Sequence, residues 1–201
     1  MAKLKLSKSA LKQERDALAR YRRFLPTLEL KKEQLVAEVR RIEKEQSAVL
    51  ERENTLQNDL ARWQALFSEP IDFARLISVS KIVTKKGNIA GVPIPLYERT
   101  EFKEEKYDLL QTPAWIDYGI AAVKELSSLQ SEQRVLSEQQ RLINAEMRVT
   151  VQRINLFDKV KIPECRSNIR KIQISIGDQQ ASAVVRGKIA KRKSVAKEEE
   201  A

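Results

Sequence analysis

The most regular feature of the chain is the spacing of its apolar residues between positions 11 and 67. Alternating steps of three and four residues visit seventeen positions there, of which thirteen are apolar. This 3.5-residue period is typical of a supercoiled helix, whereas a globular surface helix has a period of 3.6. Residues 1–67 are therefore predicted to form a coiled-coil helix, and at about 1.5 Å per residue the pattern corresponds to a rod of roughly 85 Å.

Four polar residues interrupt this heptad pattern, and a proline falls within it. The polar residues are predicted to fix the register of the coil, or to face a surrounding partner; they are Glu14, Lys32, Gln46 and Glu53. Ser7 or Ser9 can cap the first turn. Because the periodicity continues on both sides of Pro26, we expect that proline to bend the helix and not to end it.

The pattern changes between residues 68 and 112. Residues 77–83 alternate with a period near two, residues 85–88 (Lys-Lys-Gly-Asn) have turn chemistry, and residues 89–97 form a second extended run with two prolines. Two short strands around a turn predict a β-hairpin with an exposed or irregular edge. An isolated hairpin is marginally stable, so we expect it to lean on the coil or on another protein. Residues 98–108 are predicted to be a charged loop with one helical turn.

A second helix is predicted over residues 113–190, followed by a charged tail over 191–201. Thr112 provides an N-cap and Pro113 a first helical residue. A second heptad pattern runs from Trp115 to Phe157, is interrupted at Pro163, and resumes at Ile162, Ile169, Ile172 and Ile176.

Two long helices joined by a compact insertion predict an antiparallel pair. The fold class is therefore all-α dominated, a long antiparallel two-helix coiled coil with a small β-hairpin at its turn end. Residue numbers summing to about 180 place Leu11 opposite Ile169 and Gln46 close to Gln133. The same register puts both termini at one end and leaves the C-terminal helix overhanging. The predicted seam between the helices includes Leu28, Leu35, Ile42, Val49, Leu56, Leu126, Leu136, Ile143 and Ile154.

The amino-acid composition further restricts the possible folds and partners. Aromatic residues make up 5% of the chain and charged residues 33%, which argues against a thick globular core. The net charge is +10, and much of the excess lies near the two ends, among residues 3–12 and 186–197. Basic ends can bind nucleic acid, anionic membranes or acidic proteins, or can simply be solvated.

The sequence offers no chemistry for catalysis. It contains no Gly-rich phosphate loop, no metal-ligand cluster and no Ser/His/Asp set, and there is no His to activate its one cysteine, Cys165. We therefore predict a non-catalytic chain with no cofactor and no metal site. No apolar run approaches the roughly 20 residues that cross a bilayer, and no signal-peptide core is present, so no membrane insertion is expected.

Two motifs carry a family resemblance. The run from Gly87 to Pro95 (GNIAGVPIP) resembles the hairpin signature of the D subunit of the V/A-type rotary ATPases. The run from Arg153 to Glu164 (RINLFDKVKIPE) is similar to that family's Arg-Val-Asn-Ala-Leu-Glu…Ile-Pro stretch, with Leu-Phe-Asp in place of Ala-Leu-Glu. The N-terminal helix and the basic C-terminal end also fit, so the resemblance covers essentially the whole chain.

The resemblance implies a central rotor stalk that couples ATP hydrolysis or synthesis to ion transport. It implies a place at the cytoplasmic face of a membrane and three sets of partners: the A and B subunits of the catalytic head, the F subunit of the stalk, and the subunit that caps the membrane rotor ring. The implied head-facing tip comprises Lys3, Lys5, Lys8, Arg186, Lys188, Lys191, Arg192 and Lys193. The implied contacts for the F subunit or the lower stalk are Gly87, Asn88, Ile89, Gly91, Val92, Pro93 and Pro95.

Two other functions stay open at this point. One is a basic coiled-coil adaptor that binds nucleic acid or acidic partners, although no recognition fold or aromatic stacking platform supports it and no direct nucleic-acid contact is expected. The other is a homo-oligomeric structural coil. Matching helix lengths and a turn-rich middle favour pairing within one chain.

Overall fold

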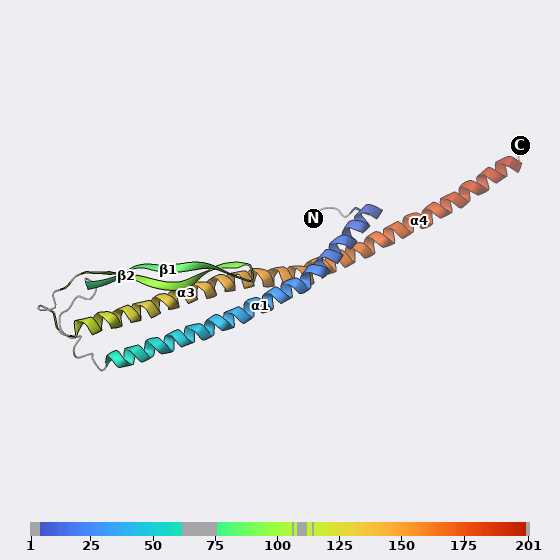
Figure 1. Cartoon of the computed structure of the whole chain (residues 1–201). Coiled ribbons are helices and arrows are strands. Elements are labelled where there is room, and N and C mark those ends of the chain that lie inside the picture. Colours follow the sequence, from blue (N-terminus) through green and yellow to red (C-terminus); the bar gives the residue numbers. More distant parts are fainter. Residues whose placement is uncertain (1–4, 62–75, 106, 108–111, 114, 200–201) are drawn as a thin grey trace. The chain divides into compact units, whose positions relative to one another are not determined.

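The computed structural model describes residues 5–61, 76–105, 107, 112–113 and 115–199, with side chains as far as residue 192. Its elements are α1 (Lys8–Ala61), β1 (Ile77–Ile89), β2 (Val92–Glu104), α3 (Ile116–Asn155), the π-helical turn η2 (Leu156–Lys161) and α4 (Ile162–Glu199) (Figure 1). The predicted fold class is confirmed, because long N- and C-terminal helices flank one antiparallel hairpin. Residues 62–67 of the predicted first helix lie outside the described residues, and the helix expected to end at residue 190 continues to Glu199.

The chain divides into two compact units. Unit 1 comprises residues 1–30 and 150–201, and unit 2 comprises residues 31–149. Both termini therefore belong to unit 1, and the hairpin belongs to unit 2. Within the described part, none of the helices has an apolar stretch long enough to cross a membrane.

Unit 2 contains a tightly packed coiled-coil seam. Leu35, Ile42 and Val49, spaced by seven residues on α1, are 0%, 0% and 1% exposed. They form one cluster with residues of α3 that are also spaced by seven: Leu129, Leu136 and Ile143. Burying one such side chain stabilises a fold by about 1.5–3 kcal/mol. These six seam residues make up half of the buried apolar residues described in unit 2.

Polar pairs across the unit 2 seam run antiparallel. Lys31 pairs with Glu146 at 2.6 Å, and Arg52 pairs with Glu132 at 3.2 Å. Gln46 donates a hydrogen bond to the Gln140 side chain over 3.4 Å. The predicted neighbour Gln133 was therefore wrong, and lies one heptad away from the observed partner Gln140. At this point the numbers of paired residues sum to about six more than the predicted 180.

The hairpin turns later than predicted. Ala90 and Gly91 form a two-residue turn with φ values of +50° and +82°, the backbone that the tightest hairpin turns require. Residues 85–88, predicted to turn, instead continue β1 and pair with residues 93–96. This register places Val92 and Ile94 on one face, where both are buried in the unit 2 cluster. Because a one-residue slip would expose both, burial fixes the register.

The segment 98–104 is also a strand and not the predicted loop. It pairs with residues 77–83 of β1, with Thr100 opposite Ile82 and Phe102 opposite Val79. Its many charged side chains hid the strand pattern, and four of them are exposed: Glu98, Arg99, Lys103 and Glu104. Each strand is therefore 13 residues long.

The hairpin leans on α3, as expected, and lies along that helix in Figure 1. In addition to the buried Val92 and Ile94, Gln139 donates a hydrogen bond of 2.6 Å to the Pro95 carbonyl. A second apolar cluster closes the base of the hairpin: Ile77, Ile116 and Ile120. Helix α3 starts at Ile116, with its amide bonded to the Pro113 carbonyl at 3.1 Å, so the predicted cap at Thr112 was placed about one turn early.

Unit 1 pairs the first turns of α1 with η2 and α4. Ser7 caps α1, because its hydroxyl accepts a hydrogen bond from the Ala10 amide at 3.2 Å. Helix α1 passes through Pro26 without ending, which confirms that part of the prediction. The departure from α-helix near the predicted interruption is the π turn η2, which ends just before α4 begins at Ile162, and α4 itself continues through Pro163.

Candidate interaction surfaces

The C-terminal part of α4 is exposed along its whole described length. Every described side chain from residue 177 to residue 192 is exposed, including Val184, Val185 and Ile189 at 58%, 56% and 50%. Most helical stability in proteins comes from packing of one face against a neighbour. A helix end whose described side chains are all exposed, apolar ones included, is therefore suited to a partner.

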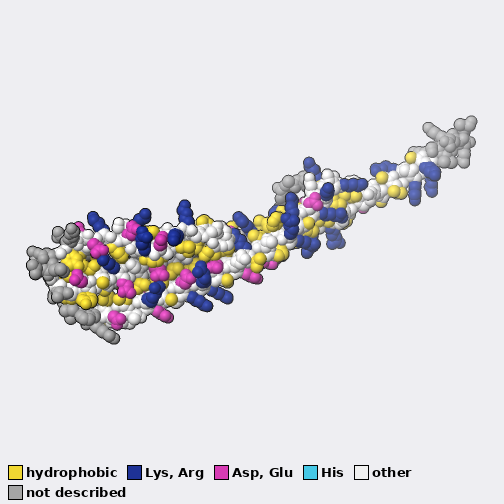
Figure 2. All heavy atoms as spheres, viewed as in Figure 1, with side chains coloured by type: hydrophobic (Ala, Val, Ile, Leu, Met, Phe, Trp, Pro, Cys, Tyr) yellow, Lys and Arg dark blue, Asp and Glu magenta, His cyan; other side chains and the backbone are white. Residues whose placement is uncertain are grey.

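The same helix end is strongly basic. Unit 1 holds 20 Lys and Arg against 9 Asp and Glu, a net charge of +11, whereas unit 2 holds 18 against 19, a net charge of −1. Figure 2 shows Lys and Arg side chains gathered along α4 with few acidic ones among them. The exposed members of the predicted tip are Lys5, Lys8, Arg186, Lys188, Lys191 and Arg192. Lys3 and the side chain of Lys193 lie outside the described residues.

The predicted hairpin residues divide between two environments. Val92 is buried, Ile89 packs beside the same cluster, and the Pro95 carbonyl is bonded to Gln139. Asn88, Gly91 and Pro93 are exposed at the turn end. Of the predicted hairpin residues, these three present a surface to another molecule, whereas Ile89, Val92 and Pro95 hold the hairpin against the rest of unit 2.

Gly87 is required by packing on the hairpin. A Cβ atom added there would lie 2.9 Å from the Leu96 side chain on the opposite strand. Leu96 itself is 40% exposed. The glycine therefore lets the Leu96 side chain pack over β1. This contact is part of the packing between the two strands and not of a ligand site.

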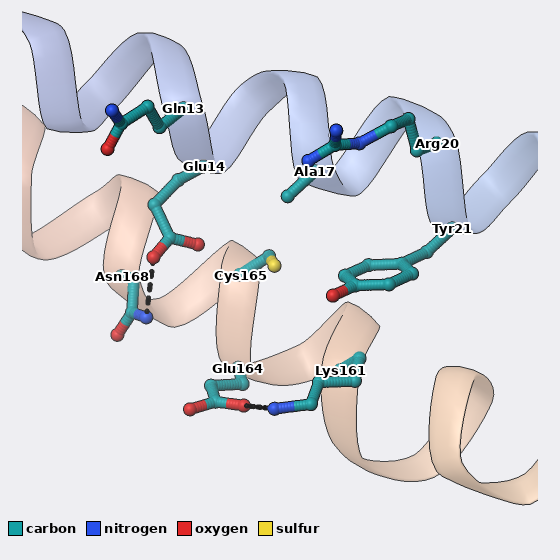
Figure 3. A pocket seen from close by; sticks show the side chains of 9 residues that line it. All are labelled: Gln13, Glu14, Ala17, Arg20, Tyr21, Lys161, Glu164, Cys165 and Asn168. Atoms are coloured by element: carbon teal, nitrogen blue, oxygen red, sulfur yellow. Dashed lines mark hydrogen bonds and ion pairs between the residues drawn. The ribbon is translucent and has the colours of Figure 1, made fainter. Parts of the chain in front are cut away.

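Unit 1 contains a cleft of about 510 Å³ between α1 and α4. Figure 3 shows Ala17 and Cys165 facing each other across it, with Glu14 bonded to Asn168 and Lys161 paired with Glu164. Burial, followed by the hydrogen bond to Glu14, raises the pKa of the Cys165 thiol to about 11. A thiol this weakly acidic is not an effective nucleophile at neutral pH, so the cleft provides no covalent chemistry.

Several other shifted groups belong to exposed ion pairs on the helices. The hydrogen bond that Arg41 donates to Glu38 raises the pKa of Arg41. The Arg141–Glu138 pair lowers the pKa of Glu138 and raises that of Arg141. Neighbouring turns of one helix supply both partners, which is the ordinary arrangement of solvated helix surfaces. Among the described residues, no cluster of three potential metal ligands exists.

A protein-family model for the D subunit of ATP synthase matches residues 10–192. The chain belongs to this family. The V-type ATP synthase D subunit of Borreliella burgdorferi is 44% identical over 197 residues, which cover 98% of each chain. The proteins of the same name from Chlamydia trachomatis and Chlamydia felis are 36% and 33% identical over 96% and 99% of this chain. The family resemblance seen in the hairpin and in residues 153–164 is thereby confirmed.

Membership of the family makes the chain a D subunit of a V-type ATP synthase, with partners inside that complex. Sequence reasoning missed two features of the surfaces described above. The first is the Gln139–Pro95 bond, for which the sequence carries no signal because it depends on the hairpin register. The second is the cleft, whose signal was the pair of small residues Ala17 and Cys165 within the seam.

Proposed function

We propose that this chain is the non-catalytic central shaft of a V-type ATP synthase. It transmits torque between ATP hydrolysis or synthesis in the A/B head and ion movement through the membrane rotor ring. The observation that carries the proposal is the C-terminal part of α4, an exposed, basic and partly apolar helix end. A catalytic subunit has no need of such a projection, whereas a shaft that enters a ring of other subunits does.

The packing of unit 2 supports a role in transmitting torque. A two-helix shaft works only if its helices do not slide past one another. Apolar side chains with 0–1% exposure on α1 interlock with those of α3. Cross-helix polar pairs such as Lys31–Glu146 and Gln46–Gln140 then penalise any shift of register.

The charge distribution supports the choice of partner for α4. A basic surface with apolar side chains fits acidic loops around an apolar socket, and such complementarity also guides association. We assign this surface to the A and B subunits of the head, with Arg186, Lys188, Lys191 and Arg192 as its basic contacts. A shaft shifts the nucleotide sites only by contacting them unequally, and a single helix end inside a ring of several sites does so.

The hairpin surface is assigned to the lower stalk. Asn88, Gly91 and Pro93 are exposed at its turn, and we propose that they contact the F subunit. The rotor-ring cap subunit docks on the remaining exposed surface of unit 2. The shaft then stands at the cytoplasmic face of the membrane, held to the bilayer by its partners.

The direct test is rotation of a single complex. The A/B head is fixed to a surface and assembled with this chain carrying Lys85→Cys, an exposed position on β1, with Cys165→Ser so that only one thiol is labelled. A bead attached at position 85 is expected to rotate in one direction when ATP is added. A complex that hydrolyses ATP while the bead shows only Brownian motion contradicts the proposal.

The matched control distinguishes a specific contact of the α4 surface from a general effect of positive charge on assembly. Replacing Arg186, Lys188, Lys191 and Arg192 by Gln is expected to weaken assembly with the head. Replacing four equally exposed basic residues of unit 2, Arg40, Lys44, Lys81 and Lys86, is expected to leave it unchanged. Equal losses from both sets indicate non-specific electrostatics and remove the assignment.

A further inference from the structure

In the unit 1 coiled coil, the helical segment that pairs with α1 carries one residue more than its heptad spacing requires. Thr150, which is 1% exposed, and Phe157, whose ring packs at a tilt against Tyr21 with ring centres 5.0 Å apart, are separated by seven residues. Cys165 and Ile172, which are 5% and 0% exposed, are also separated by seven. Phe157 and Cys165, however, are separated by eight.

The opposite helix has no such surplus. On α1, Leu11, Leu18 and Leu25 follow one another at intervals of seven and are all half-buried. Helix α1 therefore keeps a strict heptad spacing, while the helical segment opposite contains a single extra residue between Phe157 and Cys165. A local change of helix geometry in that segment must accommodate the extra residue if the two helices are to stay in contact.

A continuous α-helix could not absorb it. One extra residue turns an α-helix by about 100°, so continuing the heptad from Phe157 would place Glu164 and Lys171 in the seam. Both of these side chains are exposed or partly exposed, and neither belongs to the buried set. The buried residues are instead the ones that follow them in the sequence, Cys165 and Ile172, so the phase of the helix is corrected between Phe157 and Cys165.

The correction coincides with the π turn. η2 spans Leu156–Lys161, and the Ile162 amide bonds to the Phe157 carbonyl, five residues back. A π turn takes in one residue more than an α turn. Pro163 comes two residues after the end of η2 and has no N–H to donate to the Lys159 carbonyl, so the α-helical bonding pattern is already broken at this point.

We infer that η2 is a register-correcting device: it absorbs one surplus residue at a place set by Pro163 and so keeps Ile162, Cys165 and Ile172 against α1. The inference concerns the packing of unit 1 and does not depend on the proposed function. It makes the length of this segment, rather than the identity of its side chains, the property that matters.

Single-residue deletions in the full chain test the inference. Both deletions are made with Pro163→Ala, because a proline inside a continuous α-helix is itself destabilising. Deleting the exposed Asp158 removes the surplus residue, and the segment is expected to become α-helical with the seam in register. Its thermal midpoint, followed by far-UV circular dichroism, is expected within about 2 °C of the Pro163→Ala parent.

The matched control deletes Ser167, another exposed residue of the same unit, which lies between Cys165 and Ile172. That deletion takes Ile172 out of the seam and is expected to lower the midpoint by about 5 °C or more. It is also expected to speed amide exchange across residues 150–176 at least tenfold, whereas the Asp158 deletion does not. Equal effects of the two deletions, or a larger effect at Asp158, overturn the inference.

Discussion

The two units use the same heptad spacing with different side chains. In unit 2 the seam is apolar and closed, with Leu35, Ile42 and Ile143 all at 0% exposure. In unit 1 the seam buries Ile162, Cys165 and Ile172 but also includes the polar residues Glu14, Tyr21 and Asn168 around an open cleft. The spacing thus determines that helices pair, while the side chains at the seam determine how tightly they pair.

This difference matches what each unit is proposed to do. A closed apolar seam resists sliding, and the near-zero charge of unit 2 gives it no strong preference for basic or acidic partners. Unit 1 combines a looser seam with a net charge of +11 and an exposed helix end. The apolar side chains of α4 are exposed in this chain, and burying them against a partner would contribute a favourable hydrophobic free energy to binding.

The largest expected contrast is between two leucines of α1. Leu35→Ala in unit 2 is expected to lower the free energy of unfolding by about 3 kcal/mol, because it leaves a cavity in a closed seam. Leu18→Ala, at a half-buried seam position in unit 1, is expected to lower it by about 1 kcal/mol. Urea denaturation with amide exchange resolved for each unit measures both values. Equal losses contradict the contrast in packing.

A smaller loss is expected at the hairpin contact. Gln139→Ala removes the donor to the Pro95 carbonyl and is expected to cost about 1–2 kcal/mol. Exchange of the β2 amides is expected to rise while that of unit 1 is unchanged. Gln130→Ala is the control, since its only described bond is an exposed one to Glu53 at 3.3 Å. If Gln130→Ala lowers the free energy of unfolding as much as Gln139→Ala, the Gln139–Pro95 hydrogen bond makes no specific contribution.

A gain is expected where unit 1 is underpacked. Ala17→Leu puts apolar volume into the cleft opposite Cys165 and is expected to raise the free energy of unfolding by about 1 kcal/mol. Ala19→Leu, at an exposed position two residues away, is expected to change it little. If Ala17→Leu destabilises the protein, the cleft is already filled by its neighbours and the contrast between the units weakens.

The last prediction concerns pH. The pKa of the folded Cys165 thiol is about 11, against 9.0 for the free group. The unfolded chain therefore loses its thiol proton first, and the stability of unit 1 is expected to fall as the pH rises from about 9 to 11. Cys165→Ser is expected to remove this part of the pH dependence. A wild-type profile that coincides with the Cys165→Ser profile over that range contradicts the burial of the thiol.

Much of the fold could be predicted from the sequence because heptad spacing is a strong, repeated signal. The seam residues Leu35, Ile42, Leu136 and Ile143 follow directly from it, and all four are buried. The hairpin was predicted from its alternating runs, but its turn was misplaced. Gly87-Asn88 has the more usual turn chemistry, and burial of Val92 with Ile94 outweighed it.

The features that escaped prediction depend on contacts between distant segments. The strand at residues 98–104 was hidden by its exposed charges, and the Gln46–Gln140 pairing depended on a register that the loop lengths do not set. The π turn did leave a signal, namely the eight-residue interval from Phe157 to Cys165. The break in the heptad pattern was instead attributed to Pro163 without use of that interval, since a proline is a common cause of a break in a helix.

Amide hydrogen exchange of the full chain, alone and assembled with the A/B head, tests the central claim most directly. In the free chain, amides of residues 177–192 are expected to exchange fast and those around Leu35, Ile42 and Ile143 slowly. On assembly, residues 177–192 are expected to become protected at least tenfold, with the unit 2 seam unchanged. Assembly that leaves residues 177–192 unprotected would show that the exposed basic end of α4 is not the surface that enters the head.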